Sequence, residues 1–278
     1  MKSIFVIIII VFFNSLYYSQ IKDTFLPGQK AVQNTAEKFA PSLVSTDGDQ
    51  YGVAVNADWT ELYYTSSKGD ISSIMVIKRT GEKWSNPIPV SFSGKGNDSH
   101  PSLSKDGKKL YFVSMRSCPG AKHSLNLFCS DKKNDSWGTP YSFGSPVTDQ
   151  VVHAPSVSAS GDIYASGIVF LQKTDKGYKS PQKLKPDIKG SHPAISPDGS
   201  YIVFCALKSG GFGSNDLYVT FRKSDGTWGN PINLGSGVNT KSLESSPTIS
   251  HDGKFLFFSR NGDIWWISTN VIKSLLQK

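Results

Sequence analysis

The stretch SHPAISPDGSYIVFCA, residues 191–206, decides the fold of this chain. Residues 193–196 form a short extended run, Pro197, Asp198 and Gly199 have turn chemistry, and residues 201–206 are mostly apolar. Asp-Gly between two apolar runs is a strong hairpin signal, because both residue types tolerate the positive φ that a tight turn requires. We therefore predict two antiparallel strands joined by a tight turn in which both residues have positive φ.

The same pattern occurs five times along the chain. Two close copies are SHPSLSKDGKKLYFVS (residues 99–114) and SSPTISHDGKFLFFSR (residues 245–260). Two degraded copies are VHAPSVSASGDIYAS (residues 152–166) and YGVAVNADWTELYYTS (residues 51–66). Trp59 replaces the turn glycine in the last of these, and the copy at residues 152–166 lacks the turn Asp, so we expect different turns there. Five copies indicate a repeat architecture.

Each hairpin is followed by a third strand candidate and then by a second signature. The third strands are expected at residues 74–78, 125–130, 168–172, 216–222 and 263–268. In the first four repeats an aromatic residue then precedes a proline by three positions: Trp84 and Pro87, Trp137 and Pro140, Tyr178 and Pro181, Trp228 and Pro231. The residues after the proline suit an edge strand. Because the spacing is identical in every repeat, it favours packing between repeats over a carbohydrate-stacking site.

Four short antiparallel strands per repeat are the signature of a β-propeller blade. We predict an all-β, five-bladed propeller over residues 41–278, after an irregular lead-in at residues 21–40. Six blades are the alternative if the lead-in holds a further one. The fifth repeat ends after its third strand, and residues 41–44 (PSLV) resemble the segment after Trp228. We expect these residues to supply the missing outer strand, because closing the ring removes exposed sheet edges.

The first twenty residues are predicted to be a secretory signal peptide. Lys2 precedes an apolar run at residues 4–13 that is too short to span a bilayer. We expect a periplasmic or secreted protein without a membrane span after cleavage. The formal charge of +8 is spread along the chain, which disfavours a nucleic-acid site but leaves attraction to an anionic glycan open. Cys205 is expected to be a buried thiol, and hairpin counting does not favour a disulfide between Cys118 and Cys129.

Three repeats place an Asp-Gly pair in the turn: Asp106 and Gly107, Asp198 and Gly199, Asp252 and Gly253. We assign them a structural role, because Asp in a tight turn hydrogen-bonds its own backbone. The motifs GxSxG, HExxH, a Walker loop and CxxC are absent from the sequence. The innermost strands carry almost no acidic residues, with Asp98 and Glu244 only at their entrances, which disfavours a glycosidase with paired carboxylates. No catalytic residue is assigned.

The histidines are the candidate ligands. His100 and His192 occupy the same position, one residue before the proline of an innermost strand, so we expect them to face each other at one mouth of the channel. His153 lies two residues before Pro155, and a one-residue shift changes the face of a strand, so its direction stays open. Glu244 is added as a candidate at the same mouth. The alternatives are a divalent metal held by His100 and His192, joined by His153 if it turns inward, or plain hydrogen bonding at the strand ends.

The HP dipeptide, the SPDG turn and the apolar strand after it resemble the WD40-like repeat of TolB-type propellers over residues 41–269. One stretch matches the whole motif, namely His192, Pro193, Ser196, Pro197, Asp198 and Gly199. The resemblance implies a non-enzymatic binding or protein-interaction scaffold in the bacterial envelope, and we expect the protein to be a monomer. Its partner would be an envelope protein or an anionic glycan.

A second resemblance implies an enzyme. The oligogalacturonate lyases are similar propellers that hold a metal with channel histidines, and they act on acidic sugars. Such chemistry needs about three converging nitrogen ligands. The position of the third histidine therefore discriminates between the lyase-like interpretation and the scaffold.

Overall fold

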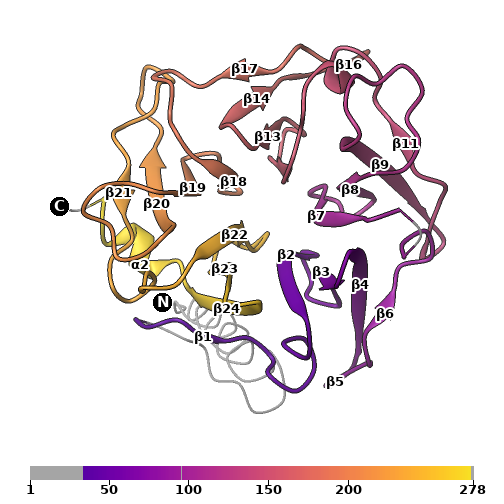
Figure 1. Cartoon of the computed structure of the whole chain (residues 1–278), viewed down its shortest axis with the longest axis horizontal. Helices are drawn as coiled ribbons and strands as arrows, with labels where there is room; N and C mark the ends of the chain where they lie inside the picture. Colours follow the sequence, from indigo (N-terminus) through magenta and orange to yellow (C-terminus); the bar gives the residue numbers. More distant parts are fainter. Residues whose placement is uncertain (1–33, 95, 277–278) are drawn as a thin grey trace, which may run out of the picture.

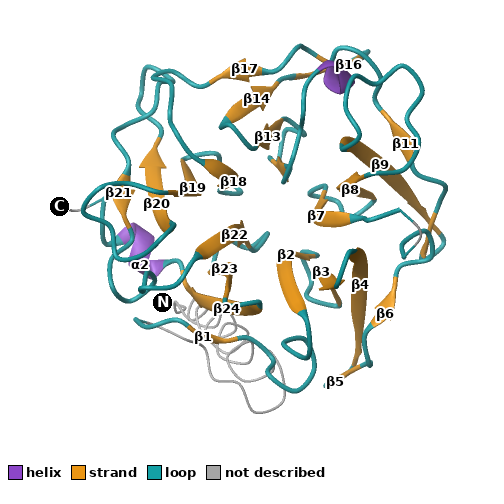
Figure 2. Ribbon diagram, in the orientation of Figure 1, coloured by secondary structure: helices purple, strands orange, loops and turns teal. Residues whose placement is uncertain are grey.

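The computed structural model describes residues 34–94 and 96–276, whose strands form five small sheets arranged around a central axis (Figures 1 and 2). The predicted signal peptide and most of the lead-in lie outside the described residues. Within them, helix is confined to the 3-10 turn η2 (Val147–Asp149) and to α2 (Asn270–Lys273). In the part of the chain that the structure describes, no helix has the length and apolar character needed to cross a membrane.

Each sheet is one blade, and its first strand lies nearest the axis (Figure 1). Blade one contains β2 (Asp49–Val55), β3 (Glu61–Lys68), β4 (Ile71–Thr80), β5 (Lys83–Trp84) and β6 (Ile88–Pro89). Blade two contains β7 (Ser99–Leu103), β8 (Lys109–Ser114), β9 (Asn126–Lys133), β10 (Ser136–Trp137) and β11 (Tyr141–Ser142). Blade three contains β12 (Ser156–Val157), β13 (Ile163–Ala165), β14 (Val169–Leu171) and β17 (Gln182–Lys183), with the small hairpin β15 (Lys173–Thr174) and β16 (Gly177–Tyr178).

Blades four and five complete the ring. Blade four contains β18 (Ser191–Ile195), β19 (Tyr201–Ala206), β20 (Asp216–Phe221) and β21 (Ile232–Asn233). Blade five contains β22 (Glu244–Ile249), β23 (Phe255–Arg260), β24 (Asp263–Ser268) and the N-terminal strand β1 (Glu37–Lys38). The predicted five-bladed propeller is thus confirmed, and the six-bladed alternative is wrong for the described chain. In blades one to four the outer strand begins one residue after the signature proline, as predicted.

An N-terminal strand closes the ring, but it is not the predicted one. Glu37 pairs with Trp266 and Lys38 with Trp265, so β1 adds the fourth strand to the last blade. Residues 41–44 instead form a turn directly after it, in which the amides of Leu43 and Val44 donate to the carbonyl of Ala40. The prediction was four residues late because a two-residue strand carries no alternating pattern.

The apolar cores lie between the blades rather than within them. On β3, Leu62 and Tyr64 pack in the cluster shared with blade five, whereas Tyr63 packs in the cluster shared with blade two. Successive side chains of a strand point to opposite faces, so the second strand of a blade must be apolar on both faces. This requirement explains the unbroken apolar runs in the repeats.

In blades two to four the repeated aromatic residue joins its blade to the preceding one, as predicted. The indole Nε1 of Trp137 donates to the hydroxyl of Tyr63 over 3.2 Å. The Tyr178 hydroxyl lies 3.4 Å from that of Tyr111, and the rings of Trp228 and Tyr164 meet edge to face at 6.3 Å.

A four-residue β-turn joins the first two strands of blade four. The amide of Gly199 (φ 72°) donates to the carbonyl oxygen of Ser196, and the glycine is the one turn residue with a positive φ.

This turn geometry corrects two predictions. Asp198 does not take a positive φ; its Oδ1 accepts hydrogen bonds from Ser196 and Ser200 instead. The two degraded repeats do not use different turns either. Trp59 (φ 59°) and Gly161 (φ 85°) occupy the same left-handed position and donate from their amides to the equivalent residues. The turn backbone is therefore common to all five blades. Cys118, Cys129 and Cys205 are free thiols.

Candidate functional site

All five blades share a backbone irregularity at the entrance of the innermost strand. One residue in each has a positive φ between 49° and 59°: Gly52, His100, Ala154, His192 and Ser246. In blade two Ser99 lies opposite Val113 while Ser102 lies opposite Tyr111, so the register gains one residue, as it also does in blades one, four and five. A β-bulge of this kind redirects side chains, and bulges are common next to functional sites.

Three histidine side chains converge at these bulges. The ring centroids of His100 and His153 lie 4.4 Å apart, those of His153 and His192 5.0 Å, and those of His100 and His192 5.2 Å. One ring nitrogen from each histidine lies within 4.8 Å of the other two. Blades two, three and four thus build one imidazole cluster at a single mouth of the channel.

His153 reaches the cluster although it stands one position earlier in its repeat. Ala154 occupies the bulge position of blade three, and the carbonyl of His153 accepts a hydrogen bond from the amide of Ser166. His153 is therefore equivalent to Ser99 and Ser191, which directly precede the other two histidines. Strict alternation of faces fails at a bulge, and so a one-residue shift does not turn the side chain away. The structure settles its direction: it turns inward.

Hydroxyl groups hold the imidazoles by their Nδ1 atoms. Nδ1 lies 3.2 Å from Ser99 Oγ in His100, 3.1 Å from Ser191 Oγ in His192 and 3.4 Å from Ser166 Oγ in His153. In the tautomer in which Nδ1 donates to the hydroxyl, Nε2 carries the lone pair; in His100 this Nε2 also lies 3.4 Å from Ser246 Oγ. Partners of this kind orient the imidazole ligands of metal sites.

The cluster is also held neutral. Burial lowers the pKa of His153 below its ordinary value, and burial together with the neighbouring His153 lowers the pKa of His192 to about 4. Burial, with smaller effects of the other two histidines, places the pKa of His100 well below its ordinary value. Neutral imidazole is the form that binds metals, so the three groups need not lose a proton first.

Blade one contributes residues that the sequence analysis did not single out. The ring of Tyr51 lies 4.8 Å from that of His100. At Gly52 (φ 59°), a Cβ would come within 3.1 Å of the His100 Cα, so a side chain at this bulge would crowd the histidine. The amide of His100 donates to Thr65 Oγ1 over 2.9 Å, which fixes its strand against blade one. The repeat alignment is the signal that could have found Tyr51, because it matches His153 in register.

Glu244 does not join the cluster. Its carboxylate is fully buried, accepts from Arg260 Nε over 2.8 Å and accepts from Thr240 Oγ1 over 2.7 Å. Asp98 holds the equivalent place in blade two, where Nη2 of Arg116 donates to both of its oxygens. These acidic residues anchor strand entrances, and the candidate ligand role of Glu244 was wrong for this reason. The turn residues Asp106, Asp198 and Asp252 accept hydrogen bonds from a Ser hydroxyl and from a backbone amide within their own turns.

The histidine mouth is open to solvent on one side. A hollow of about 350 Å³ is lined by Asp49, Tyr51, His100, His192, Ser245, Ser246, Ser259 and Gly262. Inside the histidines the channel narrows to a space of about 30 Å³ between the prolines of four innermost strands. A ligand can therefore reach the imidazoles from this mouth but not through the channel.

Comparison with known proteins shows a similarity of fold. No protein-family model and no curated protein matches the chain. Among solved structures, TolB from Acinetobacter baumannii is similar over 79% of this chain and 54% of its own length, with 15% identity and a TM-score of 0.49. The chain thus spans about half the length of that protein. The catalytic domain of Coprinopsis cinerea GH62 alpha-L-arabinofuranosidase is similar over 86% of this chain and 97% of its own, with 11% identity and a TM-score of 0.51.

A third similar structure is that of the tricorn protease, with 12% identity, a TM-score of 0.50, and coverage of 81% of this chain and 26% of that one. At such identities the likeness concerns the fold alone. The five sheets themselves establish the propeller that the repeats predicted. The similar structures include proteins that are named as enzymes, so similarity of fold does not decide the function. The function must be argued from the site.

Proposed function

We propose that this chain is an exported propeller that binds one divalent transition metal ion at the histidine mouth and acts as a binding scaffold in the bacterial envelope. The observation that carries the proposal is the convergence of His100, His153 and His192. Their ring nitrogens come within 4.8 Å of one another, and hydroxyls contact each Nδ1 atom. Three imidazoles are a donor set that suits zinc, copper, iron or nickel.

The chemistry of the donors fits such an ion. The three imidazoles are neutral, their orientation is fixed by Ser99, Ser166 and Ser191, and the hollow above them admits solvent. A site with three protein ligands leaves a coordination position open for a ligand from outside. A metal held here would act as a Lewis acid toward that ligand. In a scaffold, the open position would be filled by a donor group of the partner.

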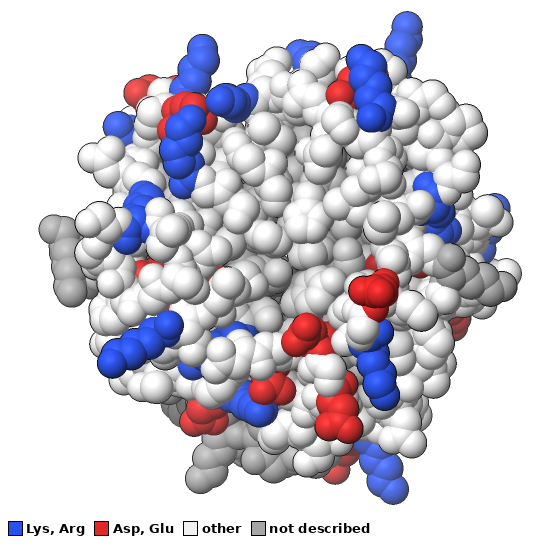
Figure 3. Space-filling model, in the orientation of Figure 1, with Lys and Arg blue, Asp and Glu red and all other residues white. Residues whose placement is uncertain are grey.

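The surface charge suits a scaffold better than a nucleic-acid binder. On the face drawn in Figure 3, most Lys and Arg side chains are dispersed toward the rim, and several Asp and Glu side chains lie below and to the right of the centre. Export rests on the predicted leader at residues 1–20. We further propose that the protein is a monomer, since ring closure leaves the propeller without an open sheet edge between its first and last blades.

The experiment is calorimetric titration of the metal-stripped protein with Zn²⁺ and Mn²⁺. We expect one site per chain in the wild type and its loss in His100→Ala, His153→Ala and His192→Ala. His123→Ala is the matched control, because His123 is exposed in a loop, is not part of the cluster and should leave binding unchanged. Circular dichroism melts verify that each variant is folded. Absence of binding in the wild type, or full binding in the three cluster variants, would overturn the metal site.

A metal-dependent enzyme acting on acidic sugars is the second candidate. The inward turn of His153 favours it, because it supplies the third nitrogen that such chemistry requires. The residues that line the hollow argue against an enzyme of this kind: Asp49 is the one acidic residue among them, and neither Lys nor Arg is present. A polyanionic substrate would be expected to meet basic side chains. Release of an unsaturated product from oligogalacturonate by the metal-loaded protein, lost in His153→Ala, would establish the enzyme instead of the scaffold.

A further inference from the structure

The opposite mouth of the channel forms a second cavity, of about 410 Å³, at the turns that end the innermost strands. Each blade contributes an aliphatic side chain from the same register position of its innermost strand, namely Val55, Leu103, Val157, Ile195 and Ile249. Two positions further on, the rim is formed by Ala57, Lys105, Ala159, Pro197 and His251. We call this space the turn-mouth cup.

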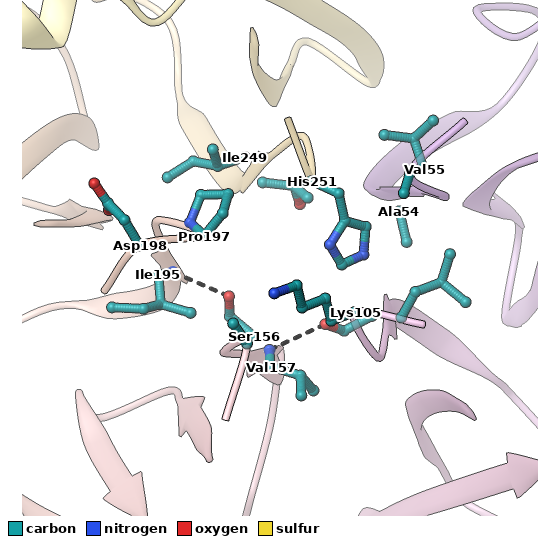
Figure 4. Close-up of a pocket in the computed structure, with 15 residues that line it drawn as sticks. Ala54, Val55, Lys105, Ser156, Val157, Ile195, Pro197, Asp198, Ile249 and His251 are labelled. Atoms are coloured by element: carbon teal, nitrogen blue, oxygen red, sulfur yellow. Dashed lines mark hydrogen bonds between the residues drawn. The ribbon is translucent and has the colours of Figure 1, made fainter. Parts of the chain in front are cut away.

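The floor of the cup is largely aliphatic, with the hydroxyl groups of Ser102, Ser156 and Thr248 among its lining. The hydroxyl of Ser102 accepts from the amide of Val157 over 3.2 Å, and that of Ser156 accepts from the amide of Ile195 over 3.0 Å (dashed lines in Figure 4). Through these two bonds the serine oxygens join neighbouring blades, while each O–H can still donate. The prolines that narrow the channel close the inner end of the cup. A ligand in this space would have to be short and would meet mainly aliphatic side chains.

Two groups of positive or hydrogen-donating character stand over this floor. Figure 4 shows the side chain of Lys105 extending into the middle of the cup, with the imidazole of His251 beside it. Within residues 34–94 and 96–276, Lys105 forms neither an ion pair nor a hydrogen bond, and the His251 ring forms no hydrogen bond. Blade one, which lies between their blades, contributes only Ala57 to the rim and so leaves room for both.

The acidic residue of the cup does not neutralise Lys105. Asp198 lines the space, but its carboxylate points away from the middle (Figure 4), and its Oδ1 accepts from Ser196 Oγ and from the amide and hydroxyl of Ser200. The cup thus combines a cation without a partner, an imidazole and an apolar floor. A buried apolar surface with a few convergent polar groups is the usual form of a small-molecule site.

We propose that the turn-mouth cup binds a small molecule in which a carboxylate is attached to an apolar body. The carboxylate lies between Lys105 and His251, and the body lies among Leu103, Ile195 and Ile249. Both charge and shape support this class of ligand. A polar sugar would leave its hydroxyls against aliphatic side chains, and a neutral apolar molecule would gain nothing from the exposed ammonium group of Lys105.

The test is calorimetric titration of the full chain with octanoate as the probe. We expect one site per chain, affinity that rises by about fourfold for each added methylene from hexanoate to octanoate until the cup is filled, and binding of 1-octanol that is weaker by about tenfold or more. Lys105→Met, which keeps the length of the side chain and removes its charge, should weaken octanoate by about tenfold or more. Lys108→Met is the matched control: Lys108 lies in the same turn, is exposed and does not line the cup.

Several outcomes would overturn the proposal. Octanoate without measurable binding would remove the site. If 1-octanol binds as tightly as octanoate, or if Lys105→Met keeps the octanoate affinity of the wild type, the ligand merely adsorbs to an apolar surface and its carboxylate is not recognised. Inorganic phosphate bound as tightly as octanoate would mean a simple anion site. His100→Ala should bind octanoate normally, so this proposal and the metal site at the other mouth can fail independently.

Discussion

The carboxylate of Glu61 and the ammonium group of Lys132 form an ion pair across the boundary between blades one and two, with 2.6 Å between Oε2 and Nζ. Their side chains are only 10% and 17% exposed. The Tyr63 hydroxyl also donates to Oε2, over 2.7 Å, and Trp137 in turn donates to that hydroxyl. The repeated aromatic residue of blade two and a carboxylate of blade one therefore belong to one network, which makes the blade boundary sensitive to pH.

The sign of this pH dependence follows from the pKa of Glu61. Burial alone would raise this pKa, but the hydrogen bonds from Lys132 and Tyr63, together with the charge of Lys132, hold it below its ordinary value of 4.5. A carboxyl whose pKa is lower in the folded protein adds stability above the unfolded pKa. That stability is lost as the pH falls through the folded pKa.

We predict that Glu61→Gln lowers the free energy of unfolding by about 1 to 3 kcal/mol at neutral pH, because it leaves Lys132 without its counter-ion. Below the pKa of Glu61 the difference between variant and wild type should shrink, since the wild type has then lost the charge too. Urea titrations at neutral pH and at a series of acid pH values measure both effects. Glu82→Gln, at an exposed position, is the control. A difference that stays constant across this range would contradict the assignment.

The closing strand gives a second prediction. Phe39, directly after β1, is 1% exposed, and its ring lies 5.1 Å from that of Phe257 and 5.4 Å from that of Trp266. Phe39→Ala should cost about 3 to 5 kcal/mol of unfolding free energy, because it leaves a cavity where the ring is closed. The control is Ile88→Ala on the outer strand of blade one, where the side chain is 55% exposed. If the two variants unfold at the same urea concentration, β1 does not hold the ring together.

The repeats were sufficient to predict the blades, because each blade carries the same hairpin and third strand, and the first four also carry the aromatic-to-proline signature. They were insufficient for β1, since Glu37 and Lys38 pair through backbone groups with Trp266 and Trp265 and leave no pattern in the sequence. Short strands of this kind are defined by the partner that they meet, here more than two hundred residues away in sequence.

The residues of the candidate site also divide into those that the repeats could predict and those that they could not. His100 and His192 could be paired from their equal positions in two repeats. The direction of the His153 side chain could not be predicted, because the alternation of faces does not hold through a bulge whose positive φ falls on Ala154. Glu244 was misassigned because its partner Arg260 lies on the neighbouring strand, and only the folded blade shows that the carboxylate is fully used.

The buried ion pair of blade two gives a third prediction. Asp98 is fully buried, and the guanidinium of Arg116 lies over the ring of Phe112 at 5.3 Å. Asp98→Asn should destabilise the protein by about 3 kcal/mol, because Arg116 then remains partly buried without a counter-ion. The double variant Asp98→Asn with Arg116→Met should recover part of this loss, since it removes the unpaired charge. A double variant less stable than Asp98→Asn would show that Arg116 acts through packing on the rings instead.

The last prediction concerns the turn that defines the repeats. Gly199 takes a φ of 72°, a left-handed conformation that costs a β-branched residue about 1 to 2 kcal/mol. A Cβ placed on Gly199 would meet no atom within 4 Å, so a side chain there suffers no clash but also gains no contact. Trp59 adopts the same conformation in blade one, where its ring packs against Phe255 at 5.9 Å and compensates for the strain. Gly199 has no such neighbour.

We therefore expect Gly199→Val to lower the free energy of unfolding by about 1 to 2 kcal/mol. Gly199→Asn should be close to the wild type, because Asn tolerates the left-handed region. Asp198→Asn should also cost little, since the amide oxygen of Asn can accept the hydrogen bonds that Ser196 and Ser200 donate. Urea titration of the three variants at neutral pH decides the matter. Equal losses for Gly199→Val and Gly199→Asn would mean that the side chain itself, and not the backbone conformation, is what this turn excludes.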